Sequence, residues 1–162
     1  MNNKKKITVV IRRADFDKLI SHLHETLDTE SMAMGFFKVS ESLTHQKLLV
    51  CETRIPKTTD YFERSPALVS LQPEFLEECF QFCEEAQCNI LDVHTHPWST
   101  APSFSSIDDH QAAKVKIPYL REYVPGVSIA FLLFGSNSGQ SRGRFWNEED
   151  REFCDVARIV IQ

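Results

Sequence analysis

The sequence predicts an α/β fold in which a mixed, curved β-sheet is flanked by helices. Several apolar runs have the length of buried strands and are bounded by polar segments, at 7–11, 32–39, 48–55 and 127–134. Two other stretches place apolar residues at helical spacing, 14–27 and 73–86. The two kinds of segment alternate along the chain, and this order is typical of a sheet with helices packed around it.

The length and composition predict a single domain spanning residues 1–162. The chain has 162 residues, of which 42% are hydrophobic and 25% charged. This length is enough for one well-buried core and too short for two stable domains. An apolar run, 153–161, ends directly before the last residue. We therefore expect either a domain cut from a longer polypeptide or a strand at a natural terminus.

The charge and the cysteines exclude several classes of protein. A net charge of −5 argues against nucleic acid and acidic membrane surfaces as partners, since both reward a basic face. No run approaches the ~18–20 apolar residues of a membrane span, and the N-terminus lacks the apolar segment of a secretion signal. Five cysteines are an odd number without a framework spacing, as expected for reduced thiols. We expect a cytoplasmic protein.

The first half of the chain contains two helices and a segment without periodicity. On the helix 14–27, His22 and His24 lie on the polar face, so we expect both at the surface. The segment 56–66 carries aromatic residues that either contact a partner or cover the core, and its length makes it a candidate recognition loop. A short strand is predicted at 67–71. Pro73 begins the next helix, because proline is favoured in a first turn.

The second half continues the alternation. A buried strand from Ile90 leads into a polar loop, and a helix begins at Ser105. Pro118 should interrupt or end that helix, which resumes at 119–123. The apolar run 127–134 reads as a central strand. A glycine-containing turn and a hairpin partner follow it, and a strand or short helix ends the chain, at 135–139, 140–146 and 153–161.

The strand that begins at Ile90 ends in two histidines that predict a metal site. His94 and His96 are two residues apart, so they share one face of a strand with Cβ atoms roughly 6–7 Å apart. Two metal–nitrogen bonds of about 2.0–2.1 Å span such a gap. Asp108, in the first turn of the following helix, is the third candidate ligand. Two histidines and one carboxylate leave a fourth position for water, as in a catalytic zinc site.

Each part of this pattern also has a purely structural interpretation. A lone His-x-His usually ends a strand, and Ser105 with Asp108 forms an ordinary capping box. The cap and the ligand are compatible, because a capped first turn holds the carboxylate still. A second metal cluster could use Cys79, Cys83 and Cys88, but their helical spacing among phenylalanines favours core packing.

The sequence His94-Thr95-His96-Pro97, followed after a loop by Ser105-Ser106-Ile107-Asp108, resembles the signature of the JAMM metalloproteases. These are the zinc-dependent members of the JAB/MPN domain family. The loop from Pro97 to Phe104 is one residue longer than is usual there. The resemblance implies the MPN (JAB) fold, a Zn²⁺ cofactor, and cleavage of isopeptide or peptide bonds at the C-terminus of ubiquitin-like proteins.

The resemblance also implies a glutamate base upstream and a serine that stabilises the oxyanion. Glu30, followed three residues later by the small Ala33 and an apolar strand, fits the family pattern. Glu25 is the alternative, but it lies within a helical pattern, where a solvated glutamate is the default. Ser105 would donate a hydrogen bond to the developing oxyanion. This mechanism needs no covalent intermediate and therefore no cysteine nucleophile.

Substrate and partners follow only from the resemblance. The compact chain resembles bacterial JAB deubiquitinase-like proteins, which occur with ubiquitin-activating-like and conjugating-like enzymes, including in antiphage defence. Three functions stay open: an isopeptidase that releases a ubiquitin-like protein from lysine, a peptidase that trims a ubiquitin-like or sulfur-carrier precursor or adduct, and a non-catalytic scaffold. Trp98 and Phe104 flank the metal loop and either clamp a substrate tail or anchor the loop.

Overall fold

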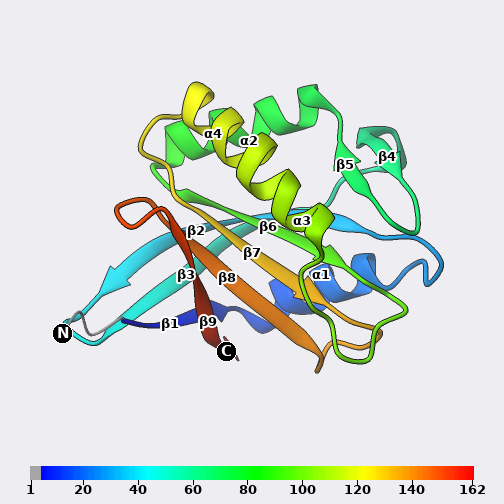
Figure 1. The fold of residues 1–162 in the computed structure, drawn as a ribbon, viewed down its shortest axis with the longest axis horizontal. Helices are drawn as coiled ribbons and strands as arrows, with labels where there is room; N and C mark the ends of the chain where they lie inside the picture. Colours follow the sequence, from blue (N-terminus) through cyan, green and yellow to red (C-terminus); the bar gives the residue numbers. More distant parts are fainter. Residues whose placement is uncertain (1–4) are drawn as a thin grey trace.

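A computed structural model describes residues 5–162, and in these residues seven strands close into a barrel (Figure 1). Strand β1 is parallel to β3 and β9, and β6 is parallel to β7. The remaining neighbours in the barrel are antiparallel. Around the barrel the strands are β1 (Lys6–Ile11), β3 (His45–Arg54), β2 (Met32–Glu41), β6 (Asn89–Thr95), β7 (Ile129–Phe134), β8 (Ser141–Asn147) and β9 (Glu152–Ile161).

The predicted fold class, an MPN (JAB) domain with a curved sheet flanked by helices, is wrong. The sheet closes on itself because β9 pairs with β1, from Ile7 opposite Val156 to Ile11 opposite Ile161. The segment 153–161, predicted as a strand or a short helix, is part of this closing strand. The apolar pattern of a strand does not encode its partner, and here the partners lie at opposite ends of the chain.

Three helical segments pack on the barrel. Helices α1 (Arg13–Leu23) and α2 (Pro73–Ala86) lie on different sides of the sheet (Figure 1). The third runs continuously through α3 (Ser106–His110), a π-helical stretch η2 (Gln111–Lys116) and α4 (Ile117–Tyr123). Pro118 therefore does not end this helix. Pro118 follows a π turn, which is wider than an α turn. Proline has no N–H to donate and its ring crowds the carbonyl of the preceding turn, and the wider turn accommodates both features.

Two hydrophobic clusters hold these layers together. The interior cluster fills the barrel and receives Phe16, Leu19 and Leu23 from α1. The outer cluster lies between the other face of β2, β6 and β7 and the layer of α2 and the α3–α4 helix. Strands β6 and β7 and the first six residues of β2 are therefore buried on both faces. In residues 5–162 no helix combines the length and apolar character that crossing a membrane requires.

A small second sheet covers one edge of the outer cluster. The short helix η1 (Thr58–Asp60) leads into β4 (Tyr61–Arg64), which pairs with β5 (Val69–Leu71). The segment 56–66 is therefore partly ordered into a strand. Its two aromatic residues differ, because Tyr61 is buried whereas Phe62 is 70% exposed.

Candidate metal centre

The structure brings His94, His96 and Asp108 together at the end of β6. One potential ligand atom from each lies within 4.8 Å of the others. Nε2 of His94 is 3.1 Å from Oδ1 of Asp108, and Nε2 of His96 is 3.3 Å from Oδ2 of the same carboxylate. Each carboxylate oxygen thus faces one imidazole. His94 is only 4% exposed, so the site is set into the protein rather than spread over its surface.

The alternation of β6 explains why both rings point the same way. Leu91 and Val93 belong to the interior cluster, whereas Ile90 belongs to the outer cluster. His94 has the parity of Ile90 and therefore faces the α3–α4 helix. The amide of His96 donates to the carbonyl of Phe134 at 2.9 Å, which extends the parallel pairing beyond the last strand residue. The two ring centroids consequently lie 5.4 Å apart.

Asp108 is held by a reciprocal cap at the start of α3. Its backbone amide donates to Oγ of Ser105 at 3.1 Å, and the Ser105 amide donates to its Oδ2 at 2.6 Å. The carboxylate thus serves as cap and as metal-facing group at once. Because Oγ of Ser105 accepts here, its own hydrogen is available for donation to another group.

Two aromatic residues flank the loop between His96 and α3 in different ways. Phe104 lies under the guanidinium of Arg144, which is 3.9 Å from its ring centroid and pairs with Asp109 in α3. Phe104 therefore anchors the start of the helix. Trp98 stacks on His96 with its ring nearly parallel, yet it is 54% exposed. Trp98 thus stands at the rim of the site.

The loop is also tied to the end of β7. The amide of Ser136 donates to the carbonyl of Ser99 at 2.8 Å. A Cβ at Gly135 would collide with that carbonyl, so this position requires glycine. His24 contacts the Gly135 carbonyl through Nε2 at 2.9 Å. The prediction of His24 as a surface residue is wrong. Helix α1 ends at Leu23, so His24 lies outside the helix and its side chain points toward this loop.

Glu30 lies beside the three candidate ligands. Its Oε1 is 3.4 Å from Nε2 of His96, and the residue is 4% exposed. The Glu30 amide donates to the carbonyl of Ser65 at 3.0 Å, and its own carbonyl accepts from Nε of Arg64 at 3.2 Å. Glu25, the alternative, is exposed and lies 3.7 Å from His22 instead.

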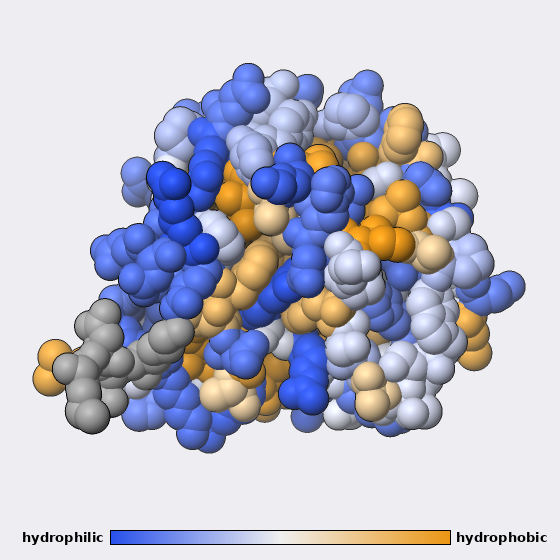
Figure 2. Space-filling view, in the orientation of Figure 1, coloured by the Kyte–Doolittle hydropathy of each residue, from blue (hydrophilic) through white to orange (hydrophobic). Residues whose placement is uncertain are grey.

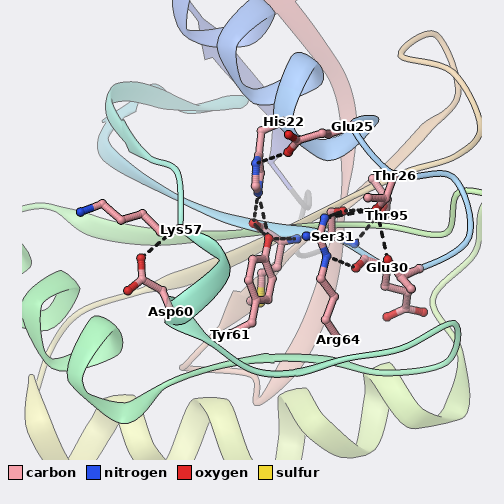
Figure 3. Close-up of polar contacts among 12 residues, drawn as sticks. His22, Glu25, Thr26, Glu30, Ser31, Lys57, Asp60, Tyr61, Arg64 and Thr95 are labelled. Atoms are coloured by element: carbon pink, nitrogen blue, oxygen red, sulfur yellow. Dashed lines mark hydrogen bonds and ion pairs between the residues drawn. The ribbon is translucent and has the colours of Figure 1, made fainter.

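A polar network fixes the chain segment that carries Glu30 (Figure 3). The backbone of Ser31 makes two hydrogen bonds with Thr95, both at 3.0 Å. The Thr95 hydroxyl accepts from the Ser31 amide, and the Thr95 amide donates to the Ser31 carbonyl. The Tyr61 hydroxyl donates to the Met32 carbonyl at 2.9 Å, and His22 lies 2.8 Å from that hydroxyl.

Sequence reasoning missed the supporting roles of Arg64, Tyr61 and His22, and His22 was wrongly predicted at the surface. Nε of Arg64 supports the Glu30 carbonyl, and its Nη2 donates to Oγ of Ser31 at 2.5 Å. Arg64 and Tyr61 lie far from Glu30 along the chain, and no local pattern signals the contacts of these two residues or of His22.

The electrostatics of the site separate Glu30 from Asp108. Burial raises the pKa of Glu30, although the nearby histidines oppose this. Burial also tends to raise the pKa of Asp108, but contact with His94 and His96 outweighs this effect and lowers the pKa overall. Burial alone would lower the pKa of His94, whereas the carboxylates of Asp108 and Asp92 raise it overall. Asp108 is thus an anion between two imidazoles, and Glu30 is the carboxyl group that takes up a proton more readily.

The donor set fits a zinc ion. Both ring nitrogens of the buried His94 lack a hydrogen-bond partner, even though Nε2 lies close to Asp108. A buried polar atom without a partner is costly, and a bound ion removes that penalty. Two imidazoles and one carboxylate are ligands that zinc accepts, with a further position left for water.

Comparison with known proteins gives a likeness of fold only. No family model matches the chain, and no curated protein matches it. Among solved structures, the solution structure of protein DSY2949 from Desulfitobacterium hafniense superposes with a TM-score of 0.55. The match covers 96% of this chain and 92% of that one, at 13% sequence identity. At this identity the shared architecture carries no information on chemistry.

Proposed function

We propose that this chain is a zinc-dependent hydrolase that cleaves an isopeptide or peptide bond after the C-terminus of a ubiquitin-like protein. The observation that supports it best is the convergence of His94, His96 and Asp108 within 4.8 Å, with the Glu30 carboxylate 3.4 Å from His96. This set matches the signature that the sequence shares with the JAMM metalloproteases. The proposal concerns the chemistry of the site and not the MPN fold.

Each residue of the site has its own role in the proposed hydrolysis. His94, His96 and Asp108 would hold the ion, whose Lewis acidity would make a water molecule a good nucleophile near pH 7. Glu30 would accept a proton from the attacking water as the water oxygen bonds to the carbonyl carbon, and would return that proton to the amine nitrogen as the carbon–nitrogen bond breaks. Ser105 donates its hydroxyl hydrogen to the carbonyl oxygen as negative charge develops there.

An extended substrate tail needs a sheet edge with unpaired backbone groups near this site. Within residues 5–162 every barrel strand is paired on both sides, so the barrel itself offers no edge for an added strand. The β4–β5 sheet does have free edges, and Arg64 of β4 hydrogen-bonds the Glu30 backbone. A ubiquitin-like tail would add to this small sheet by backbone pairing, and the exposed Trp98, which stacks on His96, would contact the tail near the site. Activating-like and conjugating-like enzymes are the partners that the resemblance to the JAMM metalloproteases implies.

We further propose a cytoplasmic location. Buried Cys79, Cys83 and Cys88 are free thiols, which suits a reducing compartment.

Metal content is the first test. The protein is purified without added metal and analysed for elements, alongside His94→Ala and Asp108→Ala. We expect about one zinc per chain in the parent and none in either variant. If the parent holds no zinc even after reconstitution, the hydrolase proposal is wrong and a binding module becomes the better account.

Substrate class is tested next on the zinc-loaded protein. Linear ubiquitin-like precursors are compared with lysine-linked conjugates, and C-terminal adducts form a third set. Cleavage of lysine-linked conjugates supports the isopeptidase, whereas cleavage of precursors or adducts alone assigns a processing peptidase. Cleavage of none, by protein that holds zinc, contradicts the proposed substrate class.

A further inference from the structure

Behind His94 lies an ion pair between a buried carboxylate and a partly exposed lysine, which the proposed chemistry does not use. Asp92 is 2% exposed and stands two residues before His94, on the same face of β6. Its Oδ2 accepts a hydrogen bond from Nζ of Lys116 at 2.7 Å. Its Oδ1 lies 3.7 Å from Nδ1 of His94, and neither of these two atoms has a hydrogen-bond partner. Lys116, Asp92 and His94 therefore form a row that ends at the candidate metal site.

The π turn explains how one helix reaches both ends of this row. Asp108 and Lys116 are eight residues apart, and eight residues rotate an α-helix by about 800°, which leaves them about 80° apart around the axis. A π turn holds about one more residue than an α turn, which brings the two side chains to within roughly 20° of each other. The π turn Gln111–Lys116 thus lets Asp108 face His94 while Lys116 faces Asp92.

The surroundings make the charge of Asp92 costly to bury. Asp92 and Lys116 line a cavity of 260 Å³ whose other walls are mostly apolar, including Met34, Ile90 and Leu120. In the space-filling view, apolar side chains reach the surface between α3 and the β4–β5 sheet, beside this cavity (Figure 2). Two charges in apolar surroundings often stabilise a fold no better than hydrophobic side chains would. A role in positioning the site accounts for their presence better than stability does.

We propose that Asp92 and Lys116 are positioning residues that orient His94 for metal binding. A carboxylate beside Nδ1 favours the tautomer with hydrogen on that nitrogen, which leaves the lone pair of Nε2 directed at the site. The 3.7 Å separation exceeds a normal N–H···O bond by only about 0.8 Å. Lys116 occupies the other carboxylate oxygen and fixes Asp92 in place. The inference rests on the proposed metal centre.

The test measures zinc affinity and the His94 tautomer separately. The variants are Asp92→Asn and the double variant Asp92→Asn with Lys116→Met, which removes both charges and leaves neither one buried alone. Zinc affinity is measured by competition with a chromophoric chelator. The tautomer is read from long-range ¹H–¹⁵N NMR of the histidine rings in metal-free protein that also carries Asp108→Ala, because the Asp108 carboxylate, 3.1 Å from Nε2, would otherwise favour hydrogen on that nitrogen. We expect zinc binding 10–100-fold weaker in both variants, and loss of the single Nδ1–H tautomer.

A matched control separates positioning from general destabilisation. Leu48→Ala removes a buried side chain of the interior cluster on β3, a strand that does not neighbour β6. It should lower the melting temperature while leaving zinc affinity and the His94 tautomer as in the parent. Lys116→Arg, which keeps a cation beside Asp92, should retain most of the affinity.

The outcomes distinguish this inference from the proposed function. If the variants bind zinc as tightly as the parent, or lose no more affinity than Leu48→Ala, Asp92 and Lys116 do not position His94, and the hydrolase proposal still stands. If the parent binds no zinc, the hydrolase proposal fails. The tautomer in metal-free protein then decides alone whether Asp92 orients the ring, and an unchanged tautomer in Asp92→Asn overturns the inference.

Discussion

The two faces of β6 present opposite chemistry to their surroundings. Leu91 and Val93 point into the barrel, where the interior cluster consists mainly of aliphatic and phenylalanine side chains. Asp92 and His94 point toward the α3–α4 helix, where buried acids, histidines and a lysine meet. A single strand of seven residues thus serves two purposes.

The difference teaches where stability and chemistry reside. The interior cluster buries apolar surface with little polar compensation to arrange, so it can hold the strand rigid. The outer layer carries buried titratable groups, each of which needs a partner or a ligand. We therefore expect substitutions on the interior face to change mainly stability, and substitutions on the outer face to change mainly metal binding and catalysis.

His96→Ala should separate metal binding from stability most clearly. The variant loses a ligand outside the interior cluster, so zinc and hydrolysis should both be abolished while the fold persists. Elemental analysis and circular dichroism check this together. A variant that keeps stoichiometric zinc would remove His96 from the ligand set.

Glu30→Gln should separate metal binding from catalysis within the outer layer. The amide cannot accept the proton of the attacking water, so the turnover rate should fall about 10²–10⁴-fold. Zinc content should stay at the parental level, because Glu30 is not one of the three candidate ligands. Cleavage at the parental rate would show that another group is the base.

Ser105→Ala should lower turnover by about 10²–10³-fold through loss of the oxyanion donor. The cap of α3 is lost as well, which lowers the free energy of unfolding by about 1 kcal/mol. Single-turnover rates and denaturant titration measure the two effects separately. Loss of stability without loss of rate would leave Ser105 as a cap only.

Leu91→Ala should lower stability and leave zinc binding unchanged, the reverse of what is expected for His96→Ala. Removing a fully buried leucine from the interior cluster should lower the free energy of unfolding by about 2–5 kcal/mol. Zinc affinity of the folded protein should be unchanged. Chemical denaturation and chelator competition measure the two quantities. A large loss of affinity would mean that the two faces of β6 are coupled.

The outer cluster should also make the protein sensitive to alkali. Burial raises the pKa of Cys79 to about 12, so the folded state holds this proton after the unfolded chain, with a thiol pKa of about 8.5, has released it. Stability is therefore unaffected by this thiol below pH ~8.5. It falls by about 1.4 kcal/mol per pH unit between ~8.5 and ~12. Unfolding titrations of the parent and Cys79→Ala across this range should show a steeper decline in the parent. Equal slopes would contradict the role of this thiol.

Local pattern sufficed for much of the site. The spacing of His94 and His96 predicts a shared face, and the capping box predicts a fixed Asp108, since both are set by residues near one another in sequence. Asp92 escaped notice because one carboxylate in an apolar run gives no sign of its partner. That partner, Lys116, depends on a π turn that no sequence pattern marked.

The sequence by itself determined most of the strands, the helix from 73 to 86 and the grouping of His94, His96 and Asp108, because periodicity and capping are local. Only the tertiary structure decided that β1 and β9 close a barrel, that Arg64 and Tyr61 hold the segment bearing Glu30, and that Lys116 reaches Asp92. These contacts join distant parts of the chain. They depend on how whole elements pack, and packing is a property of the assembled fold.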